Sequence, residues 1–362
     1  MARKYAYGII PSNEESSFGP IGLGQGSREE VYTMVHQGLC CVISDYQGQD
    51  FRGMAKEELI RCLMVHQAVI ETVMQRCTVL PIKFGTLLED SAQVQRLLQQ
   101  GYALFTDALH QIQDKVELEV AATWDTGKVL QEIGNEEEIV RLKEAIMGRP
   151  AEETLEQRIQ VGKRVKQLLD RRRDSYRERM VAFLKDTALD VQPNALLSDE
   201  MVLNVAFLTN KARQDDFDYK VRELDGVFHG EINFRIIGPL PPYSFSTVEV
   251  MRPNPDRLEE ARHLLGLGEV VSEAEVKEAY RRLGAKIHPD RNPGDQQAEE
   301  RFAKLREAST LLLAYCRGQG GGRRAKGERF PLTPQAIKDS FLITIKRPAV
   351  GEGQETPRGL TC

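Results

Sequence analysis

Residues 271–290 read VSEAEVKEAYRRLGAKIHPD, and this stretch decides the architecture of the C-terminal part of the chain. Ser272 can cap a helix here, and Glu275, three residues later, completes a capping box. Apolar residues then recur at helical spacing over the following turns. The helix must end at His288, because a residue that precedes proline is disfavoured in the α conformation.

A second helix follows after a short polar turn. Asp295 can cap this helix, and its apolar residues, Phe302 among them, again recur at helical spacing. The two helices would lie antiparallel, joined by a tip that carries His288, Pro289 and Asp290. The sequence therefore predicts a small all-α hairpin with an exposed histidine at its end.

This hairpin resembles the J domain of DnaJ-type co-chaperones. Residues 264–267 resemble the end of that domain's first helix, 275–283 its second helix, 288–290 its signature loop and 298–302 its third helix. The resemblance implies that the hairpin binds the ATPase domain of a DnaK-type chaperone and stimulates ATP hydrolysis. The residues that it assigns to this surface are His288, Pro289, Asp290, Lys277, Tyr280, Arg281, Arg282 and Lys286. Exposed cations of this kind steer association with an acidic partner.

Three features depart from the J-domain pattern. Gly284 stands inside a helix where alanine is usual, which costs about 1 kcal/mol of helix stability. Ile287 replaces the usual aromatic residue before the histidine, and no fourth-helix motif follows Cys316. We therefore expect a short or frayed module with weaker affinity for its partner. An ordinary helical hairpin with a histidine in its turn is the alternative, but it gives these residues no shared role.

The first 250 residues alternate between strand and helix periodicity. In residues 1–125, strands are predicted at 4–10, 39–45, 79–85 and 115–124, and helices at 55–77 and 92–112. This order predicts an α+β domain, which we expect to be ferredoxin-like. Residues 126–250 carry a long helix at 151–185 and further strands and a helix, and predict a second α+β domain.

The remaining boundaries follow from prolines and glycines. The sequence RPNP at 252–255 predicts a linker, because proline interrupts both helices and sheets. The J domain is then predicted at 256–317, and a flexible basic tail at 318–362 that begins with the glycine-rich run GQGGG. One strand-like segment, FLITI at 341–345, stands within that tail.

Several stretches of residues 4–248 together resemble the gas vesicle proteins F and L. They are residues 5–9, His66, residues 78–86, residues 116–120 with Trp124, Gly162-Lys163, residues 204–208 and residues 238–245. This resemblance implies an accessory protein, associated with gas vesicles in the cytoplasm, that helps to nucleate or extend the vesicle wall. Its expected partners are the small hydrophobic shell subunit and other gas vesicle accessory proteins.

Two of these stretches allow a second interpretation. Residues 79–84 predict a buried strand, but its exposed edge could instead pair with a strand of the bound client. Residues 238–245, GPLPPYSF, predict a surface strap whose Tyr243 and Phe245 pack on the domain, and the alternative is a free polyproline-like ligand. His66 is expected to be a packing residue rather than a catalyst.

Composition excludes several classes of function. The net charge is −5, from 49 basic and 54 acidic residues, which does not indicate a nucleic-acid binder. We find no apolar run near the ~20 residues that span a bilayer. The six cysteines show no metal-ligand spacing, and no motif of an enzyme or cofactor site is present. We expect a protein that is not an enzyme and needs no cofactor or metal. The alternative to a role in gas vesicle assembly is a general J-domain co-chaperone for a different client.

Overall fold

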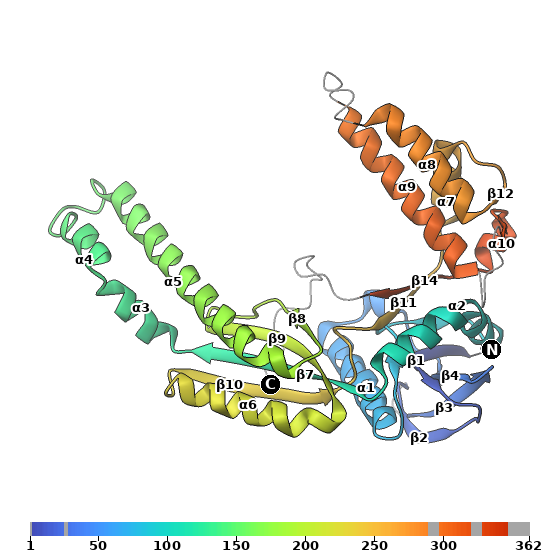
Figure 1. Cartoon of the computed structure of the whole chain (residues 1–362), viewed down its shortest axis with the longest axis horizontal. Helices are drawn as coiled ribbons and strands as arrows, with labels where there is room; N and C mark the ends of the chain where they lie inside the picture. Colours follow the sequence, from blue (N-terminus) through green and yellow to red (C-terminus); the bar gives the residue numbers. More distant parts are fainter. Residues whose placement is uncertain (1, 25–27, 289–296, 320–327, 347–362) are drawn as a thin grey trace. The chain divides into compact units, whose positions relative to one another are not determined.

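The computed structural model describes residues 2–24, 28–288, 297–319 and 328–346 (Figure 1). The chain divides into two compact units. Among the described residues, the first unit comprises those from 2 to 113 and from 246 to 346, and the second comprises residues 114–245. The boundary predicted between residues 125 and 126 therefore lies at 113/114 instead, because the strand at 115–124 pairs within the second sheet.

The first unit contains an antiparallel sheet with the strand order β2-β3-β4-β1-β5, and β6 also pairs with β1. Its strands are β1 (Arg3–Pro11), β2 (Ser17–Gly22), β3 (Glu29–His36), β4 (Leu39–Tyr46), β5 (Leu80–Pro81) and β6 (Leu87–Leu88). Its helices are η1 (Phe51–Gly53), α1 (Lys56–Met74) and α2 (Ser91–Ile112). Tyr5 and Tyr7 of β1 lie beside His66 of α1, whereas Ala6 belongs to the core that α2 covers. The two long helices thus cover opposite faces of the sheet.

The second unit contains the antiparallel sheet β10-β7-β9-β8. Its elements are β7 (Lys115–Trp124), α3 (Thr126–Gly134), α4 (Glu137–Glu144), α5 (Leu155–Leu184), η2 (Lys185–Thr187), β8 (Asp190–Pro193), β9 (Met201–Asn210), η3 (Lys211–Arg213), α6 (Gln214–Val227) and β10 (Ile232–Leu240). Apolar faces of α5 and α6 pack on this sheet, and α3 packs against α5. The strands follow the β-α-β-β-α-β connectivity of ferredoxin-like folds.

The α+β class is confirmed, but the expectation that the first domain is ferredoxin-like is wrong. The ferredoxin-like arrangement belongs to the second unit. Along the chain, β1, β2, β3 and β4 follow one another without an intervening helix, and β2 pairs with β3 and β3 with β4 as neighbouring hairpins. Periodicity did not predict β2 and β3. For the strands that it does identify, it does not determine which strands pair.

The strap, residues 238–245, packs on the second unit. Phe245 is buried against Ala206 and Leu208, and Pro241 and Pro242 are buried as well. The carboxylate of Glu117 accepts hydrogen bonds of 2.7 Å from both the backbone N–H and the hydroxyl of Ser244. The prediction of a packed strap is therefore confirmed, with Tyr243 half-buried, and the alternative of a free polyproline ligand is wrong.

Glu117 makes the stability of the second unit dependent on pH. Burial raises the pKa of its carboxyl group from 4.5 to about 7. Between these values the folded state holds a proton that the unfolded state has lost, so the free energy of unfolding falls as pH rises from 4.5 to about 7. Glu117→Gln keeps a hydrogen-bond acceptor for Ser244 and removes this titration. Chemical denaturation at pH 8 should show the variant about 3 kcal/mol more stable than wild type. An equally large gain in stability at pH 4.5 would contradict the raised pKa of Glu117.

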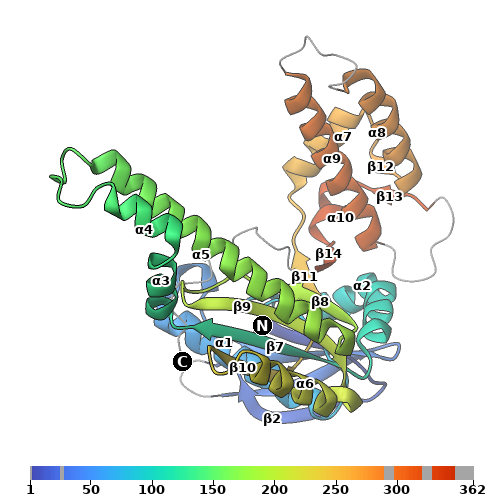
Figure 2. The ribbon, with the colours of Figure 1, turned by 60° about the vertical axis from the view of Figure 1, so that its left-hand side comes forward.

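The C-terminal part of the first unit is formed by helices and short strands. They are β11 (Thr247–Met251), α7 (Pro255–Leu265), β12 (Val270–Val271), α8 (Glu273–Ile287), α9 (Ala298–Gln319), β13 (Phe330–Pro331), α10 (Pro334–Lys338) and β14 (Leu342–Lys346). Helices α7, α8 and α9, here called the J module, lie side by side in both views (Figures 1 and 2). They share one core, to which Leu258, Val276 and Leu312 contribute.

The predicted flexible tail at 318–362 is wrong for residues 328–346. These residues form β13, α10 and β14, and β14 pairs with β11. The strand-like segment noticed at 341–345 is confirmed. The tail was predicted from its low apolar content, but the few apolar residues that it has are buried, Phe330, Ile337 and Phe341 among them. Residues 320–327 and 347–362 lie outside the described residues.

Strand β5 is buried, as predicted, and its edge is paired. Ile82 forms a parallel bridge with Val248, and the backbone N–H of Lys83 donates to the carbonyl of Val248 at 2.9 Å. The edge of residues 79–84 is thus paired with the chain's own β11, so the alternative of an exposed edge for a client strand is wrong. Within the described residues, no helix has both the length and the apolar character that crossing a bilayer requires.

Candidate functional site

Helix α8 begins as the sequence predicts. The hydroxyl of Ser272 accepts from the backbone N–H of Glu275 at 3.3 Å, and the Glu275 carboxylate accepts from the backbone N–H of Ser272 at 2.8 Å. This reciprocal capping box satisfies two N–H groups that the first turn would leave without partners. Helix α7 is capped in a similar way by Asn254 and ends at Gly266 in the left-handed conformation.

His288 stands at the C-terminal end of α8, where the backbone leaves the helical conformation. Its half-buried ring contacts Phe302 of α9 edge-on, with 5.0 Å between the ring centroids. Tyr280, two turns earlier on α8, also contacts Phe302, with 6.3 Å between the ring centroids. Phe302 therefore connects the aromatic residue and the histidine of the predicted surface. Pro289 and Asp290, the other two residues of the signature, lie outside the described residues.

The four predicted cations of α8 are all exposed. They are Lys277, Arg281, Arg282 and Lys286. Spacing of four residues places Lys277 beside Arg281 and Arg282 beside Lys286 on the helix surface. Lys277 also forms an ion pair of 3.3 Å with Glu273, one turn earlier, which partly neutralises the start of this surface. Positive charge therefore gathers toward the end of α8 that carries His288, as an acidic partner would require.

Gly284 does not mark a close approach between helices. A Cβ atom added to this glycine would lie 3.5 Å from Cε2 of Phe302, which is an ordinary van der Waals distance. Its backbone is helical, so alanine would fit without strain. We expect Gly284→Ala to raise the free energy of unfolding of the J module by about 1 kcal/mol. A lower melting temperature in calorimetry would contradict the packing described for α8 and α9.

Residues 328–346, here called the return segment, complete the module where a fourth helix was missing from the sequence pattern. Strand β13 pairs with β12, and the hydroxyl of Tyr315 donates to the carbonyl of Pro331 at 2.7 Å. Phe330, Leu332 and Ile337 are buried in the core of the module. Sequence reasoning missed these residues. Thr333 followed by proline is a helix-start signal that could have revealed α10, which Thr333 caps.

His66 is a buried packing residue, as expected. Its Nδ1 lies 2.9 Å from the hydroxyl of Tyr5, and the rings of Tyr5, Tyr7 and Phe84 surround it. Burial lowers the pKa of His66 to about 4, so it stays neutral at physiological pH. No group of three or more His, Cys, Asp or Glu side chains in the described parts of the chain is arranged to hold a metal ion.

Comparison with protein families agrees with the architecture of both regions. The family model described as gas vesicle synthesis protein GvpL/GvpF matches residues 3–247, which is more than half of the chain. The chain belongs to the GvpL/GvpF family. The model of the DnaJ domain matches residues 263–314, which include α8, His288 and most of α9. The predicted combination of a GvpL/GvpF region with a J domain is therefore confirmed.

Individual relatives in the GvpL/GvpF family match the first two thirds of the chain. Gas vesicle protein F of a Streptomyces species is 29% identical over 242 residues, which are 67% of this chain and 98% of that protein. Gas vesicle protein F of a Nostoc species is 24% identical over 247 residues, 67% of this chain and 98% of that protein.

Two solved structures share the fold of about two thirds of this chain. The crystal structure of GvpF from an Anabaena species has 23% sequence identity and a TM-score of 0.57, and the match covers 67% of this chain and 97% of that one. GvpF from Microcystis aeruginosa has 22% identity and a TM-score of 0.54, with 68% of this chain and 99% of that one covered. The matched relatives are thus covered almost completely by the GvpL/GvpF region alone.

Proposed function

We propose that this protein assists gas vesicle assembly by bringing the vesicle shell subunit to a DnaK-type chaperone. The GvpL/GvpF region would bind the hydrophobic shell subunit, alone or with other accessory proteins. The J module would recruit the chaperone and stimulate its ATPase. The place of action is the cytoplasm, at growing vesicles.

The observation that carries this proposal is the presence of both regions in one chain. The GvpL/GvpF match ends at residue 247 and the DnaJ match begins at residue 263. The J module would stimulate ATP hydrolysis by a chaperone that acts on the client bound to the same chain. The remainder of this chain belongs to the GvpL/GvpF family. The presence of both regions in one chain therefore supports the shell subunit as the client.

Covalent attachment has a physical advantage for such a task. A subunit hydrophobic enough to build a gas-filled wall exposes apolar surface before assembly, and that surface aggregates in water. When two binding regions stand on one chain, the partners that they hold meet at an effective concentration that can reach about 1 mM. This gain requires no new contact between the partners. The chaperone would therefore act on the shell subunit before it aggregates.

The proposed role does not include catalysis by this chain. Chemical work would come from ATP hydrolysis by the partner chaperone, and this chain would contribute binding surfaces only. The cations of α8 suit that role, because exposed charges raise the rate of association with an acidic surface. We accordingly propose neither a cofactor nor a resident metal.

A binding experiment with purified components tests the proposal. Shell subunit fixed to a resin is incubated with this protein, a DnaK-type chaperone and ATP. We expect the chaperone to be retained only when the wild-type protein is present, and retention to fall strongly with Arg281→Ala plus Arg282→Ala. Those two side chains are exposed, so the fold should be unaffected.

Two outcomes would point elsewhere. Binding of the chaperone without any binding of the shell subunit would favour the alternative, a general co-chaperone for another client. Binding of the shell subunit without the chaperone would leave a gas vesicle protein whose J module is inactive.

A further inference from the structure

The J module is inserted between two paired strands. Strand β11 leads into the module and β14 returns from it, and the two pair antiparallel from Thr247↔Lys346 to Met251↔Leu342. Since β11 also contacts β5 through Val248, this pair of strands is attached to the N-terminal sheet. The module is therefore held at both of its ends, and not only through the linker at 252–255.

Successive residues of the return segment are buried in two different cores. Phe341 and Ile343, 1% and 6% exposed, belong to the core formed by the N-terminal sheet and α2. Leu342, 6% exposed, belongs to the core of the J module. Alternation of this kind follows from the period of two residues in a strand, whose side chains point to opposite faces. Strand β14 thus lies between the two cores and is packed on both faces.

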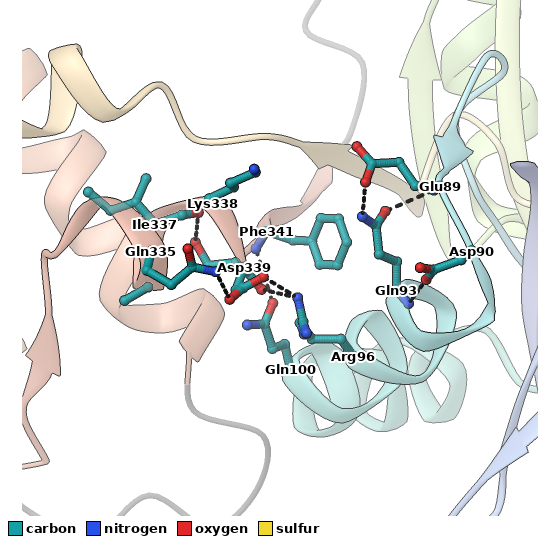
Figure 3. A network of polar contacts seen from close by, with 12 residues as sticks. Glu89, Asp90, Gln93, Arg96, Gln100, Gln335, Ile337, Lys338, Asp339 and Phe341 are labelled. Carbon is teal, nitrogen blue, oxygen red and sulfur yellow. Dashed lines mark hydrogen bonds and ion pairs between the residues drawn. The ribbon is translucent and has the colours of Figure 1, made fainter.

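Polar contacts from α2 fix the same segment (Figure 3). Nη1 of Arg96 donates to the carboxylate of Asp339 at 2.8 Å and to its backbone carbonyl at 3.2 Å. The side-chain oxygen of Gln100 accepts from the backbone N–H of Phe341 at 3.0 Å. A hydrogen bond from Gln335 and the ion pair with Arg96 lower the pKa of Asp339, so this carboxylate is charged at neutral pH.

The linker before α7 joins this network. Nη1 of Arg252 donates to the carbonyl of Lys338 at 3.1 Å, and its guanidinium lies 4.9 Å from the centroid of the Phe341 ring. The same side chain pairs with Glu89, which precedes α2, at 3.6 Å. Arg252 thus contacts both the return segment and the start of α2.

Gly318, near the end of α9, permits the close packing of this segment. A Cβ atom added there would lie 2.5 Å from the backbone carbonyl oxygen of Phe341, which is far inside van der Waals contact. Because the obstacle is backbone, no rotation of a side chain could relieve the clash. Helix α9 and β14 therefore meet at a distance that only glycine allows.

We propose that the return segment is an intramolecular docking element that holds the J module on α2 in one position. The exposed cations of α8 are then presented to the chaperone from a constant place relative to the N-terminal sheet, instead of from the end of a flexible linker. The docking itself is independent of the proposed function. Its consequence, that a client held by the same chain meets the chaperone in a defined geometry, rests on that function.

Hydrogen exchange measured by mass spectrometry on the intact protein tests the docking. In wild type we expect the peptides that cover β11 and β14 to exchange at least about a hundredfold more slowly than an unstructured chain. Gly318→Ala should speed exchange in β14 about tenfold or more, although alanine is the better helix former. Gly284→Ala is the matched control, because it makes the same change in a helix of the same module with room for the methyl group.

Charge reversal provides a second, independent variant. Asp339→Arg and Arg96→Asp should each speed exchange in β14, and the double variant should return toward wild type. Exchange of wild-type β14 at the rate of an unstructured chain would overturn the proposal. So would unchanged exchange in both Gly318→Ala and the two single charge variants.

Two functional measurements distinguish the docking of the J module from the proposed function. Stimulation of the chaperone ATPase in solution should be the same for Gly318→Ala and wild type, whereas vesicle formation in cells should fall with Gly318→Ala alone. If wild type fails to stimulate the chaperone while β14 remains protected, the proposed function fails and the docking stands. Equal vesicle formation with wild type and Gly318→Ala would overturn the proposal that a constant position of the J module serves vesicle assembly.

Discussion

His288→Gln is expected to reduce stimulation of a DnaK-type ATPase to the basal rate of the chaperone. The residue ends α8 beside the cationic surface, and its half-buried ring contacts Phe302 edge-on, with 5.0 Å between the ring centroids. Loss of an edge-on aromatic contact costs about 1 kcal/mol, which is too little to unfold the module. Steady-state ATP hydrolysis and far-UV circular dichroism, measured together, check both parts of this expectation.

His263→Gln is the matched control for that variant. His263 belongs to α7 of the same module, is exposed, and pairs with Glu259 at 2.9 Å, away from α8. We expect it to stimulate the ATPase as wild type does. Normal stimulation by His288→Gln, or an equal loss in both variants, would contradict the assignment of the chaperone-binding surface to the end of α8.

Ending the chain at Val250 should prevent the N-terminal unit from folding stably. The truncation removes β14 and with it Phe341 and Ile343, which are buried in the core of the N-terminal sheet. Truncating one buried phenylalanine already costs about 3–5 kcal/mol, against a total stability of about 5–15 kcal/mol for a domain. We expect loss of the cooperative thermal transition, or aggregation, in calorimetry.

A hairpin variant tests whether β14 causes that loss. Replacing residues 253–340 by Asn-Gly joins Arg252 to Phe341 through a two-residue turn, which suits two antiparallel strands in this register. This variant lacks the whole J module but keeps β14, and we expect it to fold and to melt cooperatively. A truncated chain as stable as the hairpin variant would show that the return segment contributes nothing to the N-terminal core.

The J module illustrates what local sequence can predict. Ser272 and Glu275 specify the start of α8, and Pro289 specifies its end at His288, because capping and the restriction before proline act over a few residues. Helical spacing likewise predicted the inward position of Phe302, and it too depends on neighbours within about one turn of helix. The cations of α8, which are exposed, were assigned from the resemblance to the J domain.

The wrong predictions all concern pairing between distant residues. Lys115–Trp124 was recognised as a strand but assigned to the first domain, although it pairs with β9 and β10 of the second. The thinly hydrophobic composition of the return segment predicts a flexible tail, yet Phe341 and Leu342 complete two cores formed mostly by other parts of the chain. Composition describes a segment by itself, whereas burial depends on the surfaces that meet it.

Vesicle formation provides a decisive measurement of the function proposed here. In cells that have every other gas vesicle component but lack this gene, vesicles are counted by electron microscopy after expression of wild type, His288→Gln or His263→Gln at equal protein levels. We expect wild type and His263→Gln to restore vesicles, and His288→Gln to restore few. Full restoration by His288→Gln would contradict the proposal that this chain delivers the shell subunit to a chaperone.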